Sequence, residues 1–331
     1  MRLTAYRQII LAFVSVAAMF SCNQDDNAAS STALLPGSTG GSLEVMVVME
    51  DSLWDGSAGE EVRKALTGPQ VGLPQSEPKY HLIHIDPSAF KSLLRRSHLL
   101  VLVDIDSVAG HKSKRDHWAK PQYILSYKGR NSRELTAQLK QHLENDLQGM
   151  RSFERSHILR RIARQKSSRS QLMKTSGIQL TLPSSFELAT DREDISIYWS
   201  RNMKSDQCII LYERPLREET TLLGGDILTV RDSVSKAFVP GQFEGSYMTT
   251  EYRLAPVIEP TELAGRFAME TRGLWRVEGD FMGGPFLNYT IYDETSSRIV
   301  TVEGFLYAPE LDKRNLLFEL EAAMHSLRFN E

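Results

Sequence analysis

The chain has 331 residues, of which 41% are hydrophobic and 24% are charged, with 39 Lys and Arg against 42 Asp and Glu. This length accommodates one large or two ordinary domains, and the composition is that of a globular protein. The net charge of −3 argues against bulk electrostatic binding of nucleic acid.

The first 21 residues have the pattern of a signal peptide. Arg2 and Arg7 precede an uncharged apolar run, Ile9 to Phe20. This run is shorter than the roughly 20 residues that a membrane-spanning helix needs, and it fits the apolar region of a signal peptide. The following Ser21-Cys22 resembles the lipobox of bacterial lipoproteins, in a relaxed form typical of Bacteroidetes. That resemblance implies that Cys22 becomes the new N-terminus and carries acyl chains such as palmitate, which anchor the protein to the membrane. An uncleaved signal anchor is the alternative.

Residues 22–43 are predicted to be a flexible lipoprotein tether, because they are rich in Ser, Thr, Gly, Ala and Asn and lack an apolar period. At its start, Asn23–Asp26 resembles the acidic signal that exports Bacteroidetes lipoproteins to the cell surface. The alternative is that these residues are only the solvated beginning of the tether. The predicted location is therefore the outer membrane, with the side that the protein faces left open.

Residues 44–130 are predicted to form an α/β domain. Apolar runs that suit buried strands alternate with segments of helical spacing, and this alternation favours a sandwich with at least partly parallel pairing. The predicted strands are Val45–Met49, Tyr80–Ile85, Leu99–Val103 and Tyr123–Tyr127, and the predicted helices are Glu60–Leu66 and Pro87–Leu94.

Residues 131–175 are predicted to be a helical connector. Leucines recur every four residues from Leu135 to Leu147, and Gly149 is expected to mark a break between two helices. The second half is basic: from Arg151 to Lys174 there are eight Lys and Arg and one acid, Glu154. Such a run is usually a solvated helical face or the neutralising partner of an acidic surface, and its functional alternative is a docking site for an anionic partner.

Residues 176–331 are predicted to form an antiparallel-rich α+β sandwich, because long alternating segments surround one internal helix and end in an amphipathic one. The order of elements is similar to that of the PsbP/Mog1-like sandwich. Cys208 lies in an apolar strand and is predicted to be a core residue. The expected helices are 227–238 and Asn315–Leu327.

Several short blocks together resemble a Bacteroidetes lipoprotein family known only as a domain of unknown function. This resemblance implies an envelope lipoprotein and brings no catalytic residues. The blocks are Leu73-Pro-Gln-Ser-Glu-Pro78, Arg231-Asp-Ser233, Ser246-Tyr-Met-Thr-Thr-Glu251, Glu270-Thr-Arg-Gly-Leu-Trp275, Phe281-Met-Gly-Gly-Pro-Phe286 and Glu303-Gly-Phe305.

Acidic residues follow the strands of the first domain. If those strands are parallel, their carboxylates meet at the carboxyl edge of the sheet, where open α/β sheets bind ligands. Several such oxygens would suit Mg²⁺ or Ca²⁺. The competing interpretation is helix capping, since an Asp before Pro or Ser is a common first residue of a helix. The predicted metal ligands are Asp51, Asp86, Asp104 and Asp106.

The segment Glu270–Phe286 is the predicted partner-binding region. It combines aromatic residues and arginine, which are enriched at interface hot spots, with a Gly-Gly-Pro turn that lets another backbone approach closely. The alternative places Trp275 and Phe286 in the core of adjacent strands, with Gly283-Gly284-Pro285 as their hairpin. The candidate binding residues are Arg272, Trp275, Phe281, Met282 and Phe286.

These observations favour a lipid-anchored envelope protein that binds or assembles with a protein or glycan partner. The alternative is a divalent-metal-dependent hydrolase that uses the acidic strand ends. The usual sequence motifs of hydrolases, metalloproteases and phosphate-binding loops are absent from the sequence. No cofactor other than that metal ion is expected.

Overall fold

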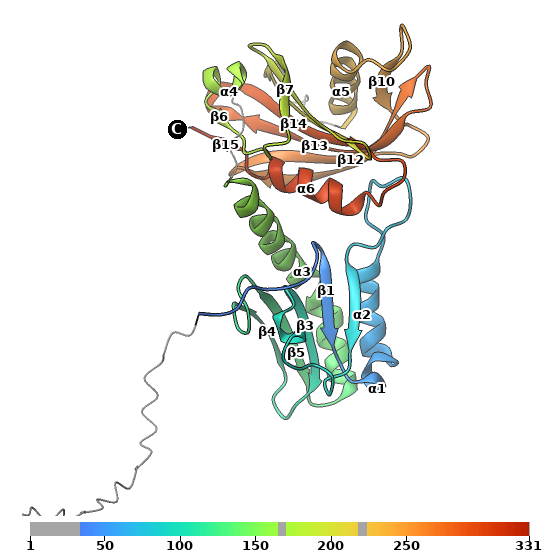
Figure 1. Cartoon of the computed structure of the whole chain (residues 1–331), viewed down its shortest axis with the longest axis vertical. Coiled ribbons are helices and arrows are strands. Elements are labelled where there is room, and N and C mark those ends of the chain that lie inside the picture. Colours follow the sequence, from blue (N-terminus) through green and yellow to red (C-terminus); the bar gives the residue numbers. More distant parts are fainter. Residues whose placement is uncertain (1–33, 165–169, 218–223, 331) are drawn as a thin grey trace, which may run out of the picture. The chain divides into compact units, whose positions relative to one another are not determined.

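The computed structural model describes residues 34–164, 170–217 and 224–330 (Figure 1). Over these residues the chain forms a five-stranded sheet, then an eight-stranded sheet, with helices packed against each. The predicted succession of an α/β part and an antiparallel-rich α+β part is confirmed. The predicted signal peptide, Cys22 and Asn23–Asp26 lie outside the described residues.

The first sheet has the strand order β2-β1-β3-β5-β4. Four strands, β1 (Glu44–Val48), β2 (His81–Ile85), β3 (Leu99–Ile105) and β5 (Tyr123–Gly129), are parallel, as their alternation with helical links predicts. The edge strand β4 (Gly110–Arg115) runs antiparallel to β5. The sequence interpretation missed β4, because all six of its residues are exposed and it has no apolar alternation.

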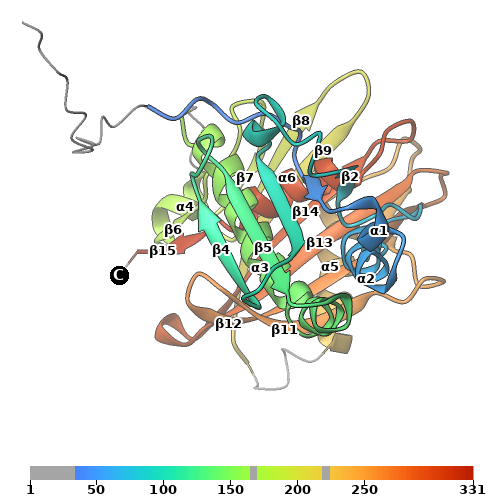
Figure 2. The same ribbon diagram turned by 90° about the horizontal axis from the view of Figure 1, so that it is seen from below.

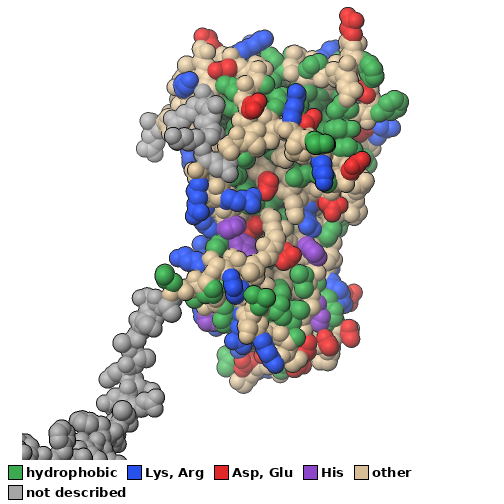
Figure 3. Space-filling view, viewed as in Figure 1, with side chains coloured by type: hydrophobic (Ala, Val, Ile, Leu, Met, Phe, Trp, Pro, Cys, Tyr) green, Lys and Arg blue, Asp and Glu red, His purple; other side chains and the backbone are tan. Residues whose placement is uncertain are grey.

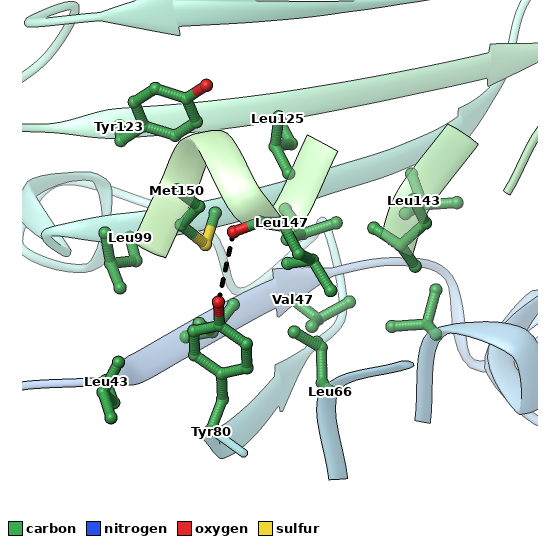
Figure 4. Close-up of a cluster of buried hydrophobic side chains, with 14 of the residues drawn as sticks. Leu43, Val47, Leu66, Tyr80, Leu99, Tyr123, Leu125, Leu143, Leu147 and Met150 are labelled. Carbon is green, nitrogen blue, oxygen red and sulfur yellow. Dashed lines mark hydrogen bonds between the residues drawn. The ribbon is translucent and has the colours of Figure 1, made fainter. Parts of the chain in front are cut away.

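One face of this sheet is covered by α2 (Ser57–Thr67) and α3 (Ser132–Ile162), which follow the short helix α1 (Asp51–Trp54). Figure 2 shows α3 behind β4 and β5. Figure 4 shows the buried leucines of α3 meeting Val47 of β1, with the Tyr80 hydroxyl donating to the Leu147 carbonyl at 3.3 Å. The opposite face carries a smaller apolar cluster that includes Phe90 and Leu100.

Two predictions about helices were wrong. The helix expected over Pro87–Leu94 is a set of turns that ends in a 3₁₀ turn, η1 (Leu94–Arg96). The break expected at Gly149 is absent, and α3 runs through it unbroken. A Cβ at Gly149 would lie 2.7 Å from the Tyr123 hydroxyl oxygen, so the glycine allows α3 to approach β5 closely.

The second sheet has the order β10-β12-β13-β14-β9-β8-β7, with β11 added beside β12. Every neighbouring pair is antiparallel, and the two faces of an antiparallel sheet can have different surroundings. Its strands are β7 (Glu187–Asp191), β8 (Ile195–Arg201), β9 (Asp206–Pro215), β10 (Tyr247–Thr250), β11 (Val257–Leu263), β12 (Arg266–Glu278), β13 (Gly283–Asp293) and β14 (Arg298–Tyr307).

Each face of this sheet carries its own helix and its own core. The helix α6 (Arg314–Met324) packs on the face that includes Leu287 and Val302. The helix α5 (Gly224–Phe238) belongs to the face that includes Trp275 and Phe305. A short helix, α4 (Gln171–Thr175), and a two-stranded pair, β6 (Ile178–Gln179) with β15 (Arg328–Phe329), complete the fold.

No helix formed by the described residues is both long enough and apolar enough to cross a membrane.

Candidate functional site

The five predicted partner-binding residues do not form one surface: they lie on both faces of the second sheet and in the turn between β12 and β13. Successive side chains of a strand point to opposite faces, so Arg272 and Trp275, three positions apart on β12, face opposite ways. Trp275 packs in the core of the α5 face and is 4% exposed, and Phe286 is completely buried beside it. Phe281, in the turn between β12 and β13, is fully exposed. Trp275 and Phe286 are therefore core residues, as the alternative interpretation of this segment stated.

Trp275 and Met282 do come together, at the wall of a cavity of about 270 Å³ on the α5 face. We call it the aromatic pocket. Trp275 and Trp199 both meet the edge or face of Phe305, with ring centroids 5.5 and 5.4 Å from it. Four aromatic rings besides Phe305 line the cavity, together with a few polar side chains. The full lining is Trp199, Arg201, Asp206, Phe238, Val239, Pro240, Gly241, Gln242, Trp275, Val277, Met282, Phe305 and Tyr307.

Polar groups stand among the aromatic side chains of the pocket. The guanidinium of Arg201 lies 4.5 Å from the ring centre of Trp199, and Gln242 donates to the Met282 sulfur at 3.4 Å. Among the described residues, the lining contains one carboxylate, Asp206, and no histidine. Mostly apolar walls with a few polar groups are typical of small-molecule sites, and aromatic faces suit a sugar ring or an apolar side chain. The lining of the pocket is therefore suited to binding a sugar ring or an apolar side chain.

The Gly-Gly-Pro segment is not the hairpin turn that the sequence suggested. Gly283 and Gly284 begin β13, and Gly284 pairs with Trp275 across the ladder. A Cβ on Gly284 would lie 2.1 Å from the Leu306 carbonyl oxygen, which accepts the Trp275 indole N–H at 3.3 Å. The turn itself lies just before, where Gly279 has φ of +85°. The glycine therefore makes room for the hydrogen bond that fixes Trp275 at the pocket wall.

A buried polar layer lies on the same face, beneath α5. The Arg231 guanidinium, which is 1% exposed, pairs with Glu303 at 2.9 Å and donates to the Thr250 hydroxyl at 2.9 Å. It also stacks 3.7 Å from the ring centre of Phe286, and Asn288 donates to Glu303 at 2.9 Å. Four of the blocks that resemble the unknown-function family thus meet in one place, where they hold the sheet and α5 together behind the pocket.

Arg272 belongs to a second buried network, on the α6 face. The Glu321 carboxylate accepts hydrogen bonds from Arg151 at 2.7 Å, Arg155 at 2.9 Å and Arg272 at 2.8 Å. Burial alone would raise the pKa of Glu321, but the charges of Arg151 and Arg272 hold it well below its usual value. Arg272 also donates to Glu270 at 2.5 Å. Arg151 and Arg155, two of the eight cations of the basic run, are therefore neutralised inside the protein.

The four predicted metal ligands do lie at the strand ends, but they do not assemble into a metal site. Asp106 pairs with Lys128 on β5, and Asp86 accepts the Ser88 amide at 2.8 Å. The Ser88 hydroxyl, followed by the Ser88 amide, lowers the pKa of Asp86. Asp51 is exposed and lies 4.0 Å from His84, and Asp104 is exposed on β3. In the part of the chain that the structure describes, no group of three or more His, Cys, Asp or Glu side chains is placed to hold a metal ion.

Cys208 is completely buried in β9, as predicted for a core residue. Burial raises the pKa of its thiol well above the usual value, with a smaller contribution from the charge of Glu303. The thiol is therefore protonated and inaccessible. Cys22, the predicted lipidation site, lies outside the described residues.

The sequence interpretation missed much of the aromatic pocket. Trp199, Arg201 and Tyr307 come from β8 and β14, which reach Trp275 only through the strand order of the sheet. Their alternation did carry a signal: Trp199 and Arg201 are two positions apart and so share a face. The pairing of distant strands brings that face to Trp275, and the alternation within a single strand does not reveal such pairing.

Comparison with solved structures finds 14 similar chains, and the three described next share little sequence identity with this chain. The Ran-binding protein Mog1p of Saccharomyces cerevisiae is 10% identical with a TM-score of 0.33, and the match covers 46% of this chain and 90% of that one. LpqN, involved in cell envelope biogenesis of Mycobacterium tuberculosis, is 11% identical with a TM-score of 0.30, covering 46% and 83%. A protein from Bacteroides thetaiotaomicron VPI-5482 is 9% identical with a TM-score of 0.24, covering 47% and 46%. No curated protein matches the chain.

Comparison with family models gives two matches, one for each part of the fold. Residues 38–165 match a domain of unknown function, DUF8532, and residues 165–326 match a second one, DUF4837. That the chain comes from Bacteroidetes and that it is a lipoprotein remain predictions from the sequence. The two matches adjoin at residue 165, just after the end of α3.

Proposed function

We propose that this protein is a lipid-anchored protein of the cell envelope that binds a protein or glycan partner through the aromatic pocket. The observation that carries the binding function is the pocket itself, where Trp199, Trp275 and Tyr307 surround a space beside polar side chains. Aromatic anchors in a concave site provide most of the free energy of binding in many complexes.

The anchoring part of the proposal rests on residues 1–22. An apolar run that ends at Ser21-Cys22 supports acylation of Cys22, and several acyl chains on one cysteine make membrane attachment stable. The outer membrane is the proposed location, with surface exposure decided by Asn23–Asp26. Labelling cells with an alkyne-tagged fatty acid tests this directly: the label should be lost in Cys22→Ala, and a label that persists in this variant contradicts lipidation at Cys22.

Site-specific photocrosslinking in cells tests the pocket. A photoreactive phenylalanine analogue at Gln242, on the pocket wall, or at Phe281, in the neighbouring exposed turn, should trap the same partner. The matched control is Phe267, which lies on β12, is 50% exposed and does not line the pocket. The expected result is one defined adduct from positions 242 and 281 and none from 267. Equal adducts from all three positions, or none from any, would contradict the proposal.

A glycan partner is tested separately by fluorescence. Two of the four tryptophans of the chain line the pocket, so a bound sugar should change the emission of the purified protein. The probes are polysaccharide and lipopolysaccharide purified from the same cells. Met282→Glu, which places a charge on the wall at a partly buried position, should abolish the response while circular dichroism stays native. A response unchanged in Met282→Glu would place the glycan elsewhere.

A further inference from the structure

A second cavity lies on the five-stranded part of the fold, between the C-terminal half of α3 and the segment that links β4 to β5. Its volume is about 650 Å³. Five cationic side chains line it, against one carboxylate, Asp116. We call it the basic hollow. The cations are Arg115, Lys120, Arg160, Arg161 and Arg164.

Most of this positive charge is left uncompensated. Arg161 pairs with Glu319 at 2.6 Å, and Lys120 lies 3.8 Å from Asp116. Over residues 34–164, 170–217 and 224–330, Arg115, Arg160 and Arg164 have no carboxylate within ion-pair distance. Arg115 instead lies over the rings of Tyr123 and Phe153, at 5.7 and 5.6 Å. Such stacking orients a guanidinium without neutralising it.

The single acid of the basic run does not neutralise the hollow. Glu154 is 1% exposed, and its carboxylate lies 2.5 Å from the His98 ring and accepts the Ser42 hydroxyl at 2.9 Å. Burial would raise the pKa of Glu154, but the His98 hydrogen bond and charge lower it overall. The His157 ring lies 4.6 Å from His98 and lines the hollow, and burial followed by the His98 charge lowers the pKa of His157. The hollow therefore offers a neutral imidazole among its cations at neutral pH.

Residues 36–38 lie at the rim of this hollow. The Lys120 amide donates to the Pro36 carbonyl at 2.9 Å, and the Ser38 amide donates to the Lys120 carbonyl at 3.3 Å. Figure 3 shows Lys, Arg and His side chains gathered beside the point where the described chain begins. With the proposed anchoring at Cys22, residues 36–38 beside the hollow follow the membrane anchor closely in the chain; this step rests on the proposed function, whereas the hollow itself does not.

We propose that the basic hollow binds a phosphate group. Guanidinium groups match the oxygens of phosphate in charge and in bidentate geometry, and several of them around one space favour a group of more than one negative charge. The phosphate monoester of a membrane lipid headgroup and a soluble phosphate share this chemistry. The position of the hollow beside the entering chain, on the anchored protein, favours the lipid as its source, since anionic headgroups attract basic clusters close to the membrane.

The test uses the full chain carrying Cys22→Ala, so that acyl chains contribute nothing to binding. Inorganic phosphate is titrated by calorimetry at constant ionic strength, and co-sedimentation is measured with vesicles of phosphatidylcholine, with or without phosphatidic acid. The variant is Arg160→Gln with Arg164→Gln, two exposed residues without a carboxylate partner in the described structure. The matched control is Arg133→Gln with Lys140→Gln, which removes the same charge from exposed positions at the other end of α3.

We expect the Arg160/Arg164 variant to bind inorganic phosphate and phosphatidic acid vesicles about tenfold more weakly, while the Arg133/Lys140 control retains the affinity of the parent chain. Binding of phosphate without binding of vesicles would assign the hollow to a soluble phosphate, and binding of both would assign it to the headgroup. Absence of both, an unchanged affinity in the variant, or an equal loss in the control would overturn the proposal. Acyl labelling at Cys22 and crosslinking at the aromatic pocket are independent of these results.

Discussion

His325 shows how one half-buried side chain sets a pH limit on this fold. Its Nε2 lies 3.1 Å from the Tyr289 hydroxyl, which donates to Glu270 at 2.8 Å. Burial, followed by the charge of Arg155, lowers the pKa of His325 to about 4. The imidazole is thus neutral in the folded state at neutral pH, and it completes the polar network that surrounds Glu321.

This pKa predicts a loss of stability in mild acid. Between pH about 6.5 and about 4 the unfolded state binds a proton at His325 that the folded state does not, so the free energy of unfolding falls as the pH decreases through this interval. His325→Gln removes this proton uptake, and we expect a smaller decrease of melting temperature between pH about 7 and about 4.5 than in the parent chain. Thermal unfolding followed by circular dichroism measures it, and equal decreases in the two chains would refute the role of His325.

At the scale of elements, α6 organises the contacts between the α/β part and the antiparallel part of the fold. Glu77, in the loop before β2, accepts the amides of Lys313 at 2.8 Å and Arg314 at 2.9 Å. These amides stand at the N-terminus of α6, where N–H groups lack a partner within the helix and the helix dipole favours a negative charge. The blocks Leu73–Pro78 and Glu270–Trp275, which resembled a family of unknown function, therefore both hold α6, one at its end and one at Glu321.

We predict that Glu77→Ala destabilises the protein by about 1–2 kcal/mol, the usual effect of losing a helix cap. Glu77→Gln, which keeps an acceptor and removes the charge, should lie between Glu77→Ala and the parent chain. Urea unfolding measures these differences. Glu310→Ala is the control, because Glu310 is exposed and precedes the same helix. A Glu77→Ala effect no larger than that of Glu310→Ala would exclude a capping role.

The elements show where the sequence was informative. The apolar runs of β1, β3 and β5 and the leucine period of α3 were predicted because burial on one or two faces leaves a direct pattern. Exposed β4 left none. Gly149 and Gly284 were misassigned as a break and a turn for one reason: each permits a close approach to a distant partner, Tyr123 and Leu306, that local sequence does not reveal. The same limit hid the pairing of strands that builds the aromatic pocket.

At the scale of the whole molecule, the α/β part and the antiparallel part of the fold share a core. Phe318 and Ala322 of α6 pack in the cluster formed by α2, α3 and the five-stranded sheet. Arg151 and Arg155 of α3 bind the same carboxylate, Glu321, as Arg272 of β12. If α3 or α6 unfolded alone, the remaining helix would expose apolar surface and its charged side chains would lose their ion-pair partners. The two helices are therefore expected to unfold together.

We accordingly predict one cooperative unfolding transition over both domains. Trp54 and Trp118 report on the first domain, and Trp199 and Trp275 on the second, so chains that keep one pair and carry Phe in place of the other read each domain separately. The two urea midpoints should coincide. Phe318→Ala should lower the free energy of unfolding by about 3–5 kcal/mol and so move both midpoints together to lower urea. Two separate midpoints in the parent chain would mean that the domains fold independently.

The entry of the chain into the first sheet has a mechanical consequence. Gly37 pairs in parallel with Lys120, Thr39 pairs in parallel with Ser97, and β1 then lies between its parallel neighbours β2 and β3. A pull on the N-terminus acts along these strands, so it loads their hydrogen bonds in shear, and many must break at once instead of opening one after another. If the chain is anchored through Cys22, as proposed above, it would bear tension through the buried strand β1, and a force on a bound partner would be resisted before the fold unfolds.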